Sequence, residues 1–198
     1  MKAIFFDLDG TLLHFTRDYR EILEDTFRTV VGEVRDEWID TYNEVFFELF
    51  EDCESDVYQR SFASTTVRAD PSSFVEVLRD KETKMCQPPE GATDDLERLS
   101  GEYKLGVLTN GVAEWQTAKL EAHGLASHFD TIVASYDVGA HKPALAPFRA
   151  AQERLPADAY AMVGDGDADI HGAQEAGWCS YRYHGQGFSD LPEAINRG

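Results

Sequence analysis

The chain has 198 residues, enough for one domain or for one domain with an insertion, and 42% of them are hydrophobic, too many for a disordered acidic tail. Its net charge of −19 disfavours nucleic acid as a partner, because a polyanion would be repelled, and no apolar run is long enough to span a membrane. We therefore expect a cytoplasmic globular protein that binds neither nucleic acid nor membrane; a monomer is plausible, although the sequence does not determine the oligomeric state.

Five short apolar runs predict the strands of a parallel sheet. They are Lys2–Phe6, Lys104–Leu108, Thr131–Ala134, Tyr160–Val163 and Cys179–Tyr183. Helical patterns separate the last four runs, over Val112–His123, Ala144–Leu155 and Ala168–Ala176. This alternation of strands and helices predicts an α/β fold, with helices on both faces of the sheet.

The segment between the first two predicted strands has a different pattern. Apolar residues recur there at helical spacing, Asp70–Pro71 is typical of a helix start, and no convincing strand is visible. The proline-containing segment Gln87–Gly91 is the expected boundary on the return to the sheet. The sequence therefore predicts a helical insertion over residues 16–90, and a core built from residues 1–15 and 91–198.

Polar residues follow three of the predicted strands, and one lysine precedes a predicted helix. They are Asp7, Asp9, Thr109, Asn110, Asp165, Asp167, Asp169 and the lysine, Lys142. Open parallel sheets bind ligands beyond the carboxyl ends of their strands, so we expect these side chains on one rim. Carboxylates held close together repel one another unless something neutralises them, which a divalent cation does, and oxygen ligands favour Mg²⁺. Lysine, threonine and asparagine donors beside Mg²⁺ suit a phosphoryl group that a carboxylate attacks.

The segments DLDGT, LTNG, HKP and GDGDAD stand in the order and spacing of the four motifs of the haloacid dehalogenase-like phosphohydrolase superfamily, and the resemblance covers the whole chain. It implies a Rossmann-like core of five parallel strands in the order 3-2-1-4-5, with an inserted α-helical cap. It also implies that Asp7 is a nucleophile that forms an aspartyl-phosphate. Asp9 would then protonate the leaving oxygen and afterwards activate water as a base.

The same resemblance implies the ligands of the metal ion. Mg²⁺ would bind the carboxylate of Asp7, the backbone carbonyl of Asp9 and the carboxylate of Asp165, with Asp169 supporting it through water molecules. The fourth motif commonly has one more residue between its two acids than lies between Asp165 and Asp169. Asp167 is a further carboxylate nearby, so it stays open as an alternative to Asp169.

The resemblance further implies that Thr109 and the backbone of Asn110 hold phosphate oxygens, and that Lys142 pairs with both phosphate and nucleophile. The true dehalogenases of the superfamily lack the second aspartate of the first motif, which is present here as Asp9. We therefore expect a Mg²⁺-dependent phosphatase for a small phosphate monoester, of the nucleotide, sugar phosphate or phosphoglycolate class. A phosphomutase or a 2-haloacid dehalogenase is the alternative on the same fold, and a phospho-acceptor or binding module is the non-enzyme alternative.

Overall fold

The computed structural model describes residues 1–185 and 187–193, and its chain divides into two compact units. The first, here called the core unit, combines Met1–His14 with the described part of Gln87–Gly198. The second, here called the helical unit, is Phe15–Cys86. Within the described residues, no helix combines the length and apolar character needed to cross a membrane.

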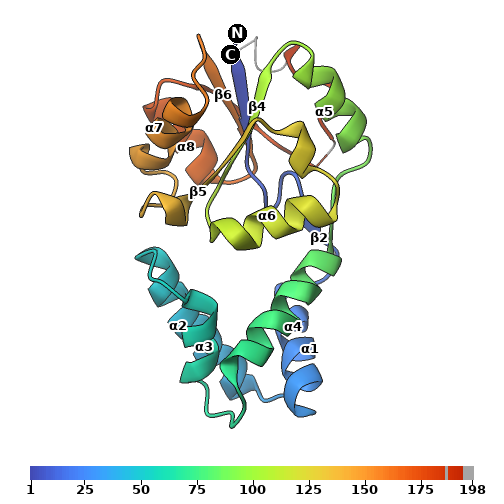
Figure 1. Cartoon of the computed structure of the whole chain (residues 1–198), viewed down its shortest axis with the longest axis vertical. Coiled ribbons are helices and arrows are strands. Elements are labelled where there is room, and N and C mark those ends of the chain that lie inside the picture. The colour runs from blue at the N-terminus through green and yellow to red at the C-terminus, as the bar shows by residue number, and fades with distance from the viewer. Residues whose placement is uncertain (186, 194–198) are drawn as a thin grey trace. The chain divides into compact units, whose positions relative to one another are not determined.

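A five-stranded parallel sheet forms the centre of the core unit (Figure 1). Its strands are β1 (Ala3–Phe6), β4 (Lys104–Thr109), β5 (Thr131–Ala134), β6 (Tyr160–Gly164) and β7 (Cys179–Arg182). All neighbouring strands pair in parallel, in the order β5-β4-β1-β6-β7. This arrangement is the predicted order 3-2-1-4-5, so the expectation of an α/β fold with this sheet is confirmed.

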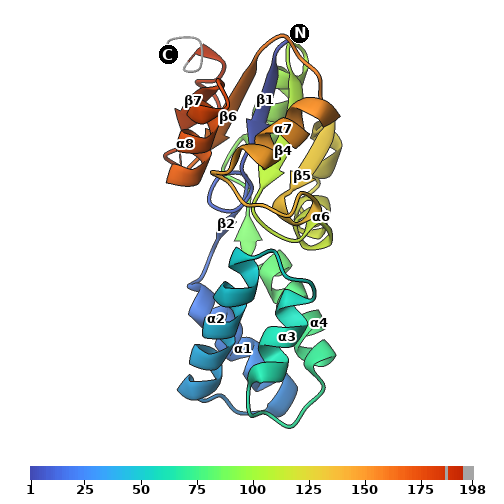
Figure 2. The ribbon, with the colours of Figure 1, turned by 90° about the vertical axis from the view of Figure 1, so that its left-hand side faces the viewer.

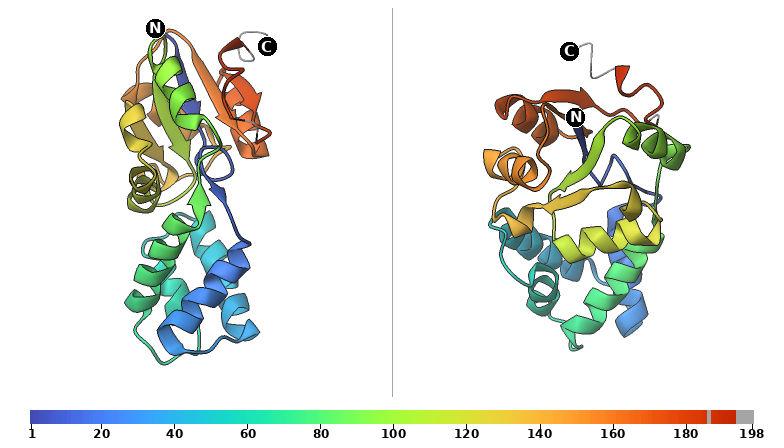
Figure 3. Two further views of the ribbon diagram at one scale, coloured as in Figure 1. Left: turned by 90° about the vertical axis from the view of Figure 1, so that its right-hand side faces the viewer. Right: turned by 45° about the horizontal axis from the view of Figure 1, so that its top comes forward.

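Helices cover both faces of the sheet, with α7 and α8 on one face and α5 and α6 on the other (Figures 1 and 3). Their bounds are α5 (Ala92–Ser100), α6 (Ala113–Ala122), α7 (Leu145–Arg154) and α8 (Asp167–Glu175), and the short 3₁₀ helices are Ala126–His128 and Ser135–Asp137. On the α7–α8 face, the ring of Trp178 packs 5.3 Å from that of Phe5 and 5.2 Å from that of Phe148. Burying side chains of this size contributes about 1.5–3 kcal/mol each.

The helical unit consists of α1 (Tyr19–Val31), α2 (Asp36–Glu51), α3 (Val57–Ser64) and α4 (Pro71–Lys84) (Figure 2). Asp70 caps α4 by accepting a hydrogen bond from the backbone N–H of Ser72, as the Asp70–Pro71 pair predicts. The ring of Phe27 packs against those of Phe62 and Phe74, with centroids 5.7 and 5.3 Å away. The unit therefore has an apolar centre of its own.

Two short strands lie at the points where the chain passes from one unit into the other. They are β2 (His14–Phe15) and β3 (Cys86–Gln87), which pair with each other in a two-stranded sheet. Next to them, the backbone N–H of Thr16 donates to the carbonyl of Met85 at 2.8 Å. The expectation of no strand within residues 16–90 is therefore wrong. A strand of two residues is too short to show an alternating pattern, and its partner lies far away in the sequence.

Candidate active site

The carboxyl ends of β1, β4 and β6 carry most of the residues that the sequence singles out. Phe6 is the last residue of β1 and pairs with Val107 of β4 and Val163 of β6, so the three strands end almost level. The backbone N–H of Asp7 then donates to the carbonyl of Val163 at 2.8 Å. The register thus places Asp7 beside the residues that follow β4 and β6 at one edge of the sheet.

Asp7, Asp165 and Asp169 form a cluster of carboxylates, each with an oxygen within 4.8 Å of the others. Gly10 makes this approach possible, because its φ is +86° and a Cβ atom there would lie 2.5 Å from Oδ2 of Asp165. The hydroxyl of Thr11 donates to Oδ1 of Asp165 at 3.1 Å. Carboxylates this close repel one another unless positive charge lies between them, and an oxygen donor set of this kind suits a hard divalent cation.

The two candidates for the second acid of the fourth motif lie in different surroundings. Asp169 is buried, and its Oδ1 accepts a hydrogen bond from Nζ of Lys142 at 2.6 Å. The side chain of Asp167 is 77% exposed and pairs with Arg182. The structure therefore brings Asp169 to Asp7 and leaves Asp167 at the surface, on the first turn of the same helix.

Lys142 joins three parts of the site through its buried ammonium group. Nζ donates to Oδ1 of Asp7 at 2.7 Å, to Oδ1 of Asp169 at 2.6 Å and to the carbonyl of Leu108 at 2.7 Å. Burial alone would lower its pKa, but the carboxylates of Asp7 and Asp169 outweigh this effect and raise the pKa above its ordinary value. Lys142 therefore stays charged, with an acceptor for each of its three protons.

Asp7 has an unusual protonation equilibrium for an aspartate. Burial raises its pKa to about 7, and the neighbouring charge of Asp169 adds to the rise, while Lys142 opposes it. A carboxylate with this pKa is partly protonated near neutral pH. A divalent cation bound to the carboxylate cluster would favour the ionised form, which is the form that can act as a nucleophile.

Asn110 holds the loop that carries Lys142. Its side-chain Nδ2 donates to the carbonyl of Lys142 at 3.1 Å, and its Oδ1 accepts from the backbone N–H of Lys142 at 2.8 Å. Both ends of the amide are therefore engaged by the Lys142 backbone. This arrangement supports Lys142 and assigns the Asn110 side chain a structural task.

Two residues of α6, Gln116 and Lys119, belong to the site although the sequence motifs do not include them. Nζ of Lys119 donates to Oδ1 of Asp9 at 2.6 Å, and Nε2 of Gln116 donates to Oδ2 of Asp9 and to Oγ1 of Thr109, both at 2.8 Å. The sequence carries no amphipathic signal for them, because the apolar residues of α6 do not gather on one side of the helix. The structure shows that both are buried, and buried polar side chains require partners, which Asp9 and Thr109 supply.

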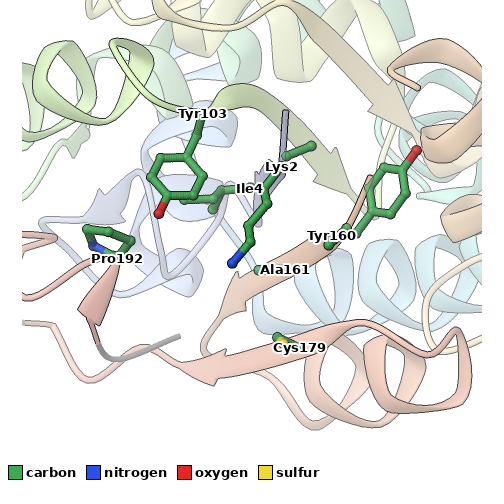
Figure 4. A pocket seen from close by; sticks show the side chains of 9 residues that line it. Lys2, Ile4, Tyr103, Tyr160, Ala161, Cys179 and Pro192 are labelled. Carbon is green, nitrogen blue, oxygen red and sulfur yellow. The ribbon is translucent and has the colours of Figure 1, made fainter. Parts of the chain in front are cut away.

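A small cavity at the opposite end of the sheet can be set aside as the site (Figure 4). It is lined by residues at the amino ends of β1, β6 and β7, among them Ile4, Tyr160 and Cys179, and by Tyr103. Its volume is about 50 Å³, whereas pockets for small-molecule ligands measure about 300–1,000 Å³. The cavity has room for water alone, and Lys2 is the one charged side chain that lines it among the described residues.

Comparison with known proteins identifies the family of the chain. Residues 4–181 match the model of the haloacid dehalogenase-like hydrolase family. The chain is 30% identical over 190 residues to the pyrimidine 5′-nucleotidase YjjG of Escherichia coli, covering 88% of this chain and 82% of that protein.

Two solved structures resemble the chain along most of its length. A 2-haloacid dehalogenase from Pseudomonas syringae has a TM-score of 0.76 and 25% identity, with 100% of this chain and 99% of that chain covered. The magnesium-bound hydrolase YfnB of Bacillus subtilis has a TM-score of 0.64 and 25% identity, with 90% and 85% covered. The chain therefore belongs to the haloacid dehalogenase-like hydrolase family.

Proposed function

We propose that the protein is a Mg²⁺-dependent phosphatase that hydrolyses a small phosphate monoester through an aspartyl-phosphate on Asp7. One observation carries the proposal: the Asp7 carboxylate contacts the buried ammonium of Lys142 and lies within 4.8 Å of carboxylate oxygens of Asp165 and Asp169. A nucleophile, a cation site and a phosphate-binding ammonium group thus meet at one point.

The donor set fits Mg²⁺. The carboxylates of Asp7 and Asp165, together with the backbone carbonyl of Asp9, would hold the ion, with Asp169 beside them. These ligands are hard oxygen donors, and Mg²⁺ prefers them to nitrogen or sulfur. The bound ion would supply positive charge that stabilises the phosphoryl oxygens during transfer. The solved relative YfnB, which binds magnesium, supports this assignment.

The first half of the proposed reaction transfers the phosphoryl group to the protein. A carboxylate oxygen of Asp7 attacks phosphorus, and the bond between phosphorus and the leaving oxygen breaks. Asp9, two residues further along the same loop, delivers the proton that the leaving oxygen takes up. The product alcohol then departs, and the phosphoryl group remains on Asp7.

The second half regenerates Asp7. Asp9, now without its proton, accepts a proton from a water molecule as that water attacks phosphorus. The bond between phosphorus and the Asp7 oxygen breaks, and inorganic phosphate is released. In both halves, the Thr109 hydroxyl and the Asn110 backbone N–H would donate hydrogen bonds to the phosphoryl oxygens, and the Lys142 ammonium would supply positive charge beside them.

The proposed substrate belongs to the nucleotide, sugar phosphate or phosphoglycolate class. The likeness to a pyrimidine 5′-nucleotidase supports a nucleotide most directly. We further propose that the helical unit, Phe15–Cys86, is a cap that excludes water from the reacting groups.

A 2-haloacid dehalogenase activity is the second candidate, because a structure of that name shares the fold over the whole chain. Two features favour phosphate over a halogenated acid. Asp9 supplies the proton that an alkoxide leaving group needs and a halide does not. The cluster of Asp7, Asp165 and Asp169 supplies ligands for a cation, whereas the hydrolysis of a carbon–halogen bond needs none.

The test is a Mg²⁺ titration of p-nitrophenyl phosphate hydrolysis by the wild type and two variants. We expect EDTA to abolish wild-type turnover. Asp165→Asn removes a charge from the carboxylate cluster and should raise the Mg²⁺ concentration for half-maximal activity by about 10–100-fold. Asp167→Asn is the matched control, because its carboxylate pairs with Arg182 at the surface, and should shift it less than about 2-fold.

Two results would contradict the proposal. One is turnover that survives exhaustive removal of divalent cations. The other is release of chloride from 2-chloropropionate by a wild-type protein that hydrolyses no phosphate ester. A larger effect of Asp167→Asn than of Asp165→Asn would reverse the assignment of the cation ligands.

A further inference from the structure

The carboxylate of Asp9 is held by two side chains from one face of α6. Nζ of Lys119 donates to Oδ1 at 2.6 Å, and Nε2 of Gln116 donates to Oδ2 at 2.8 Å. Because the two donors are three residues apart on a helix, they project side by side. Each oxygen of Asp9 thus has its own donor, and the carboxylate is fixed both in position and in its rotation about the Cβ–Cγ bond.

The two donors are buried, whereas Asp9 is partly exposed. The side chain of Lys119 is 3% exposed, and Gln116 is also buried. A buried ammonium group is stable only beside an acceptor, so α6 is placed such that Lys119 reaches Asp9. The Asp9 side chain itself is 38% exposed. Its open side is available to an incoming leaving group, while its inner side is occupied by the two donors.

Gln116 also connects Asp9 to the end of β4. The same nitrogen that donates to Asp9 donates to Oγ1 of Thr109 at 2.8 Å. The contacting atom is the amide nitrogen, whose two protons are available to the two acceptors. With its oxygen already accepting from Gln116, the Thr109 hydroxyl directs its own proton elsewhere, which suits a donor to a phosphoryl oxygen.

We infer that Gln116 and Lys119 are positioning residues, which place the Asp9 carboxylate against the leaving oxygen and orient the Thr109 hydroxyl toward the phosphoryl group. The inference rests on the phosphatase function proposed above and assigns a task to two residues outside the four motifs. Neither residue contacts the transferred group; each acts through Asp9 or Thr109. Removing either donor should therefore harm the two proton transfers that need Asp9 more than it harms substrate binding.

The experiment compares an activated and an unactivated substrate for Lys119→Met and Gln116→Leu. p-Nitrophenolate leaves without help, whereas the alkoxide of glycerol phosphate needs a proton from Asp9. We expect kcat/KM, which reports the steps up to departure of the leaving group, to fall about 10–100-fold further for glycerol phosphate than for p-nitrophenyl phosphate. KM should change less than kcat, and Lys119→Arg should recover part of the loss, because it keeps a charged donor.

Two controls separate positioning from a general structural effect. Lys104→Met removes a lysine of the same unit that donates to the carbonyl of Pro156, and should leave both rates within about 2-fold. In an Asp9→Asn background, Lys119→Met should add less than about 2-fold, because its effect acts through Asp9. Thermal melts of all variants identify any that fold poorly, and Gln116→Leu, which changes no charge, provides the second line of evidence.

The outcomes distinguish a failure of the positioning role from a failure of the proposed function. Three results would overturn the positioning role alone: equal losses of kcat/KM for both substrates, losses that add fully to those of Asp9→Asn, or single variants as active as a wild type that hydrolyses both substrates. A wild-type protein with no phosphatase turnover would overturn the proposed function, and the positioning role with it. A selective loss with glycerol phosphate that disappears in the Asp9→Asn background would support both.

Discussion

Asp7→Asn is expected to lower kcat for any phosphate ester by at least ~10³-fold while leaving the fold intact, because an amide is a poor nucleophile. The substitution keeps the size of the side chain. Lys142 retains two of its three acceptors, Asp169 and the carbonyl of Leu108. Removing one charge also relieves the repulsion from Asp169 that raises the pKa of Asp7.

The measurement is steady-state hydrolysis of p-nitrophenyl phosphate at saturating Mg²⁺, with a thermal melt of the same preparation. Asp167→Asn is the matched control, since it makes the same chemical change at a side chain that is 77% exposed. If Asp7→Asn kept a tenth of the wild-type kcat, Asp7 would not be the nucleophile. A loss of activity accompanied by a collapsed melting transition would point to a structural role instead.

Lys142→Met is expected to destabilise the core unit more than any surface lysine variant. The substitution leaves the carboxylates of Asp7 and Asp169 close together without the ammonium group that now contacts both. Removing one partner of a buried ion pair typically costs about 3–5 kcal/mol. For a protein of this size, that corresponds to a fall in Tm of roughly 10 °C. Activity should be lost as well, because the positive charge beside the phosphoryl oxygens disappears.

Thermal melts with EDTA and with excess Mg²⁺ test this expectation. Mg²⁺ should restore part of the lost Tm, because a cation at the carboxylate cluster replaces some of the missing positive charge. Lys84→Met is the control: its ammonium group pairs with Asp80 while its side chain is 71% exposed, and such a pair contributes about 0–1 kcal/mol. Equal changes in Tm for the two variants would contradict the account of Lys142.

The sheet and its acidic rim could be predicted from the sequence for a physical reason. Strands buried on both faces appear as short apolar runs, and the change to polar residues marks their carboxyl ends, where sites in such folds lie. Asp7 after β1 and Asp165 after β6 follow this rule. Thr109 is the last residue of β4 rather than the first residue after it, because its backbone still pairs with Ala134 of β5.

Other elements are only weakly indicated by local sequence patterns. Helix α3, Val57–Ser64, begins after Asp56 without a side-chain cap, and its order depends on tertiary packing against other helices of the helical unit. Strand β3 is two residues long and owes its pairing to a segment far away in the chain. The contacts of Gln116 and Lys119 with Asp9 join positions more than a hundred residues apart, and the apolar residues of α6 do not gather on one side, so no local sequence pattern could identify either residue or its partner.

If a phosphoryl group passes through Asp7 during turnover, it can be mapped on the protein. The wild type and Asp9→Asn would be mixed with p-nitrophenyl phosphate and Mg²⁺, quenched in acid and digested for peptide mass spectrometry. We expect a phosphoryl group on Asp7, transient in the wild type and accumulating in Asp9→Asn, where water is no longer activated. Turnover of the ester with no phosphoryl group on Asp7, or with the group on a different residue, would contradict it.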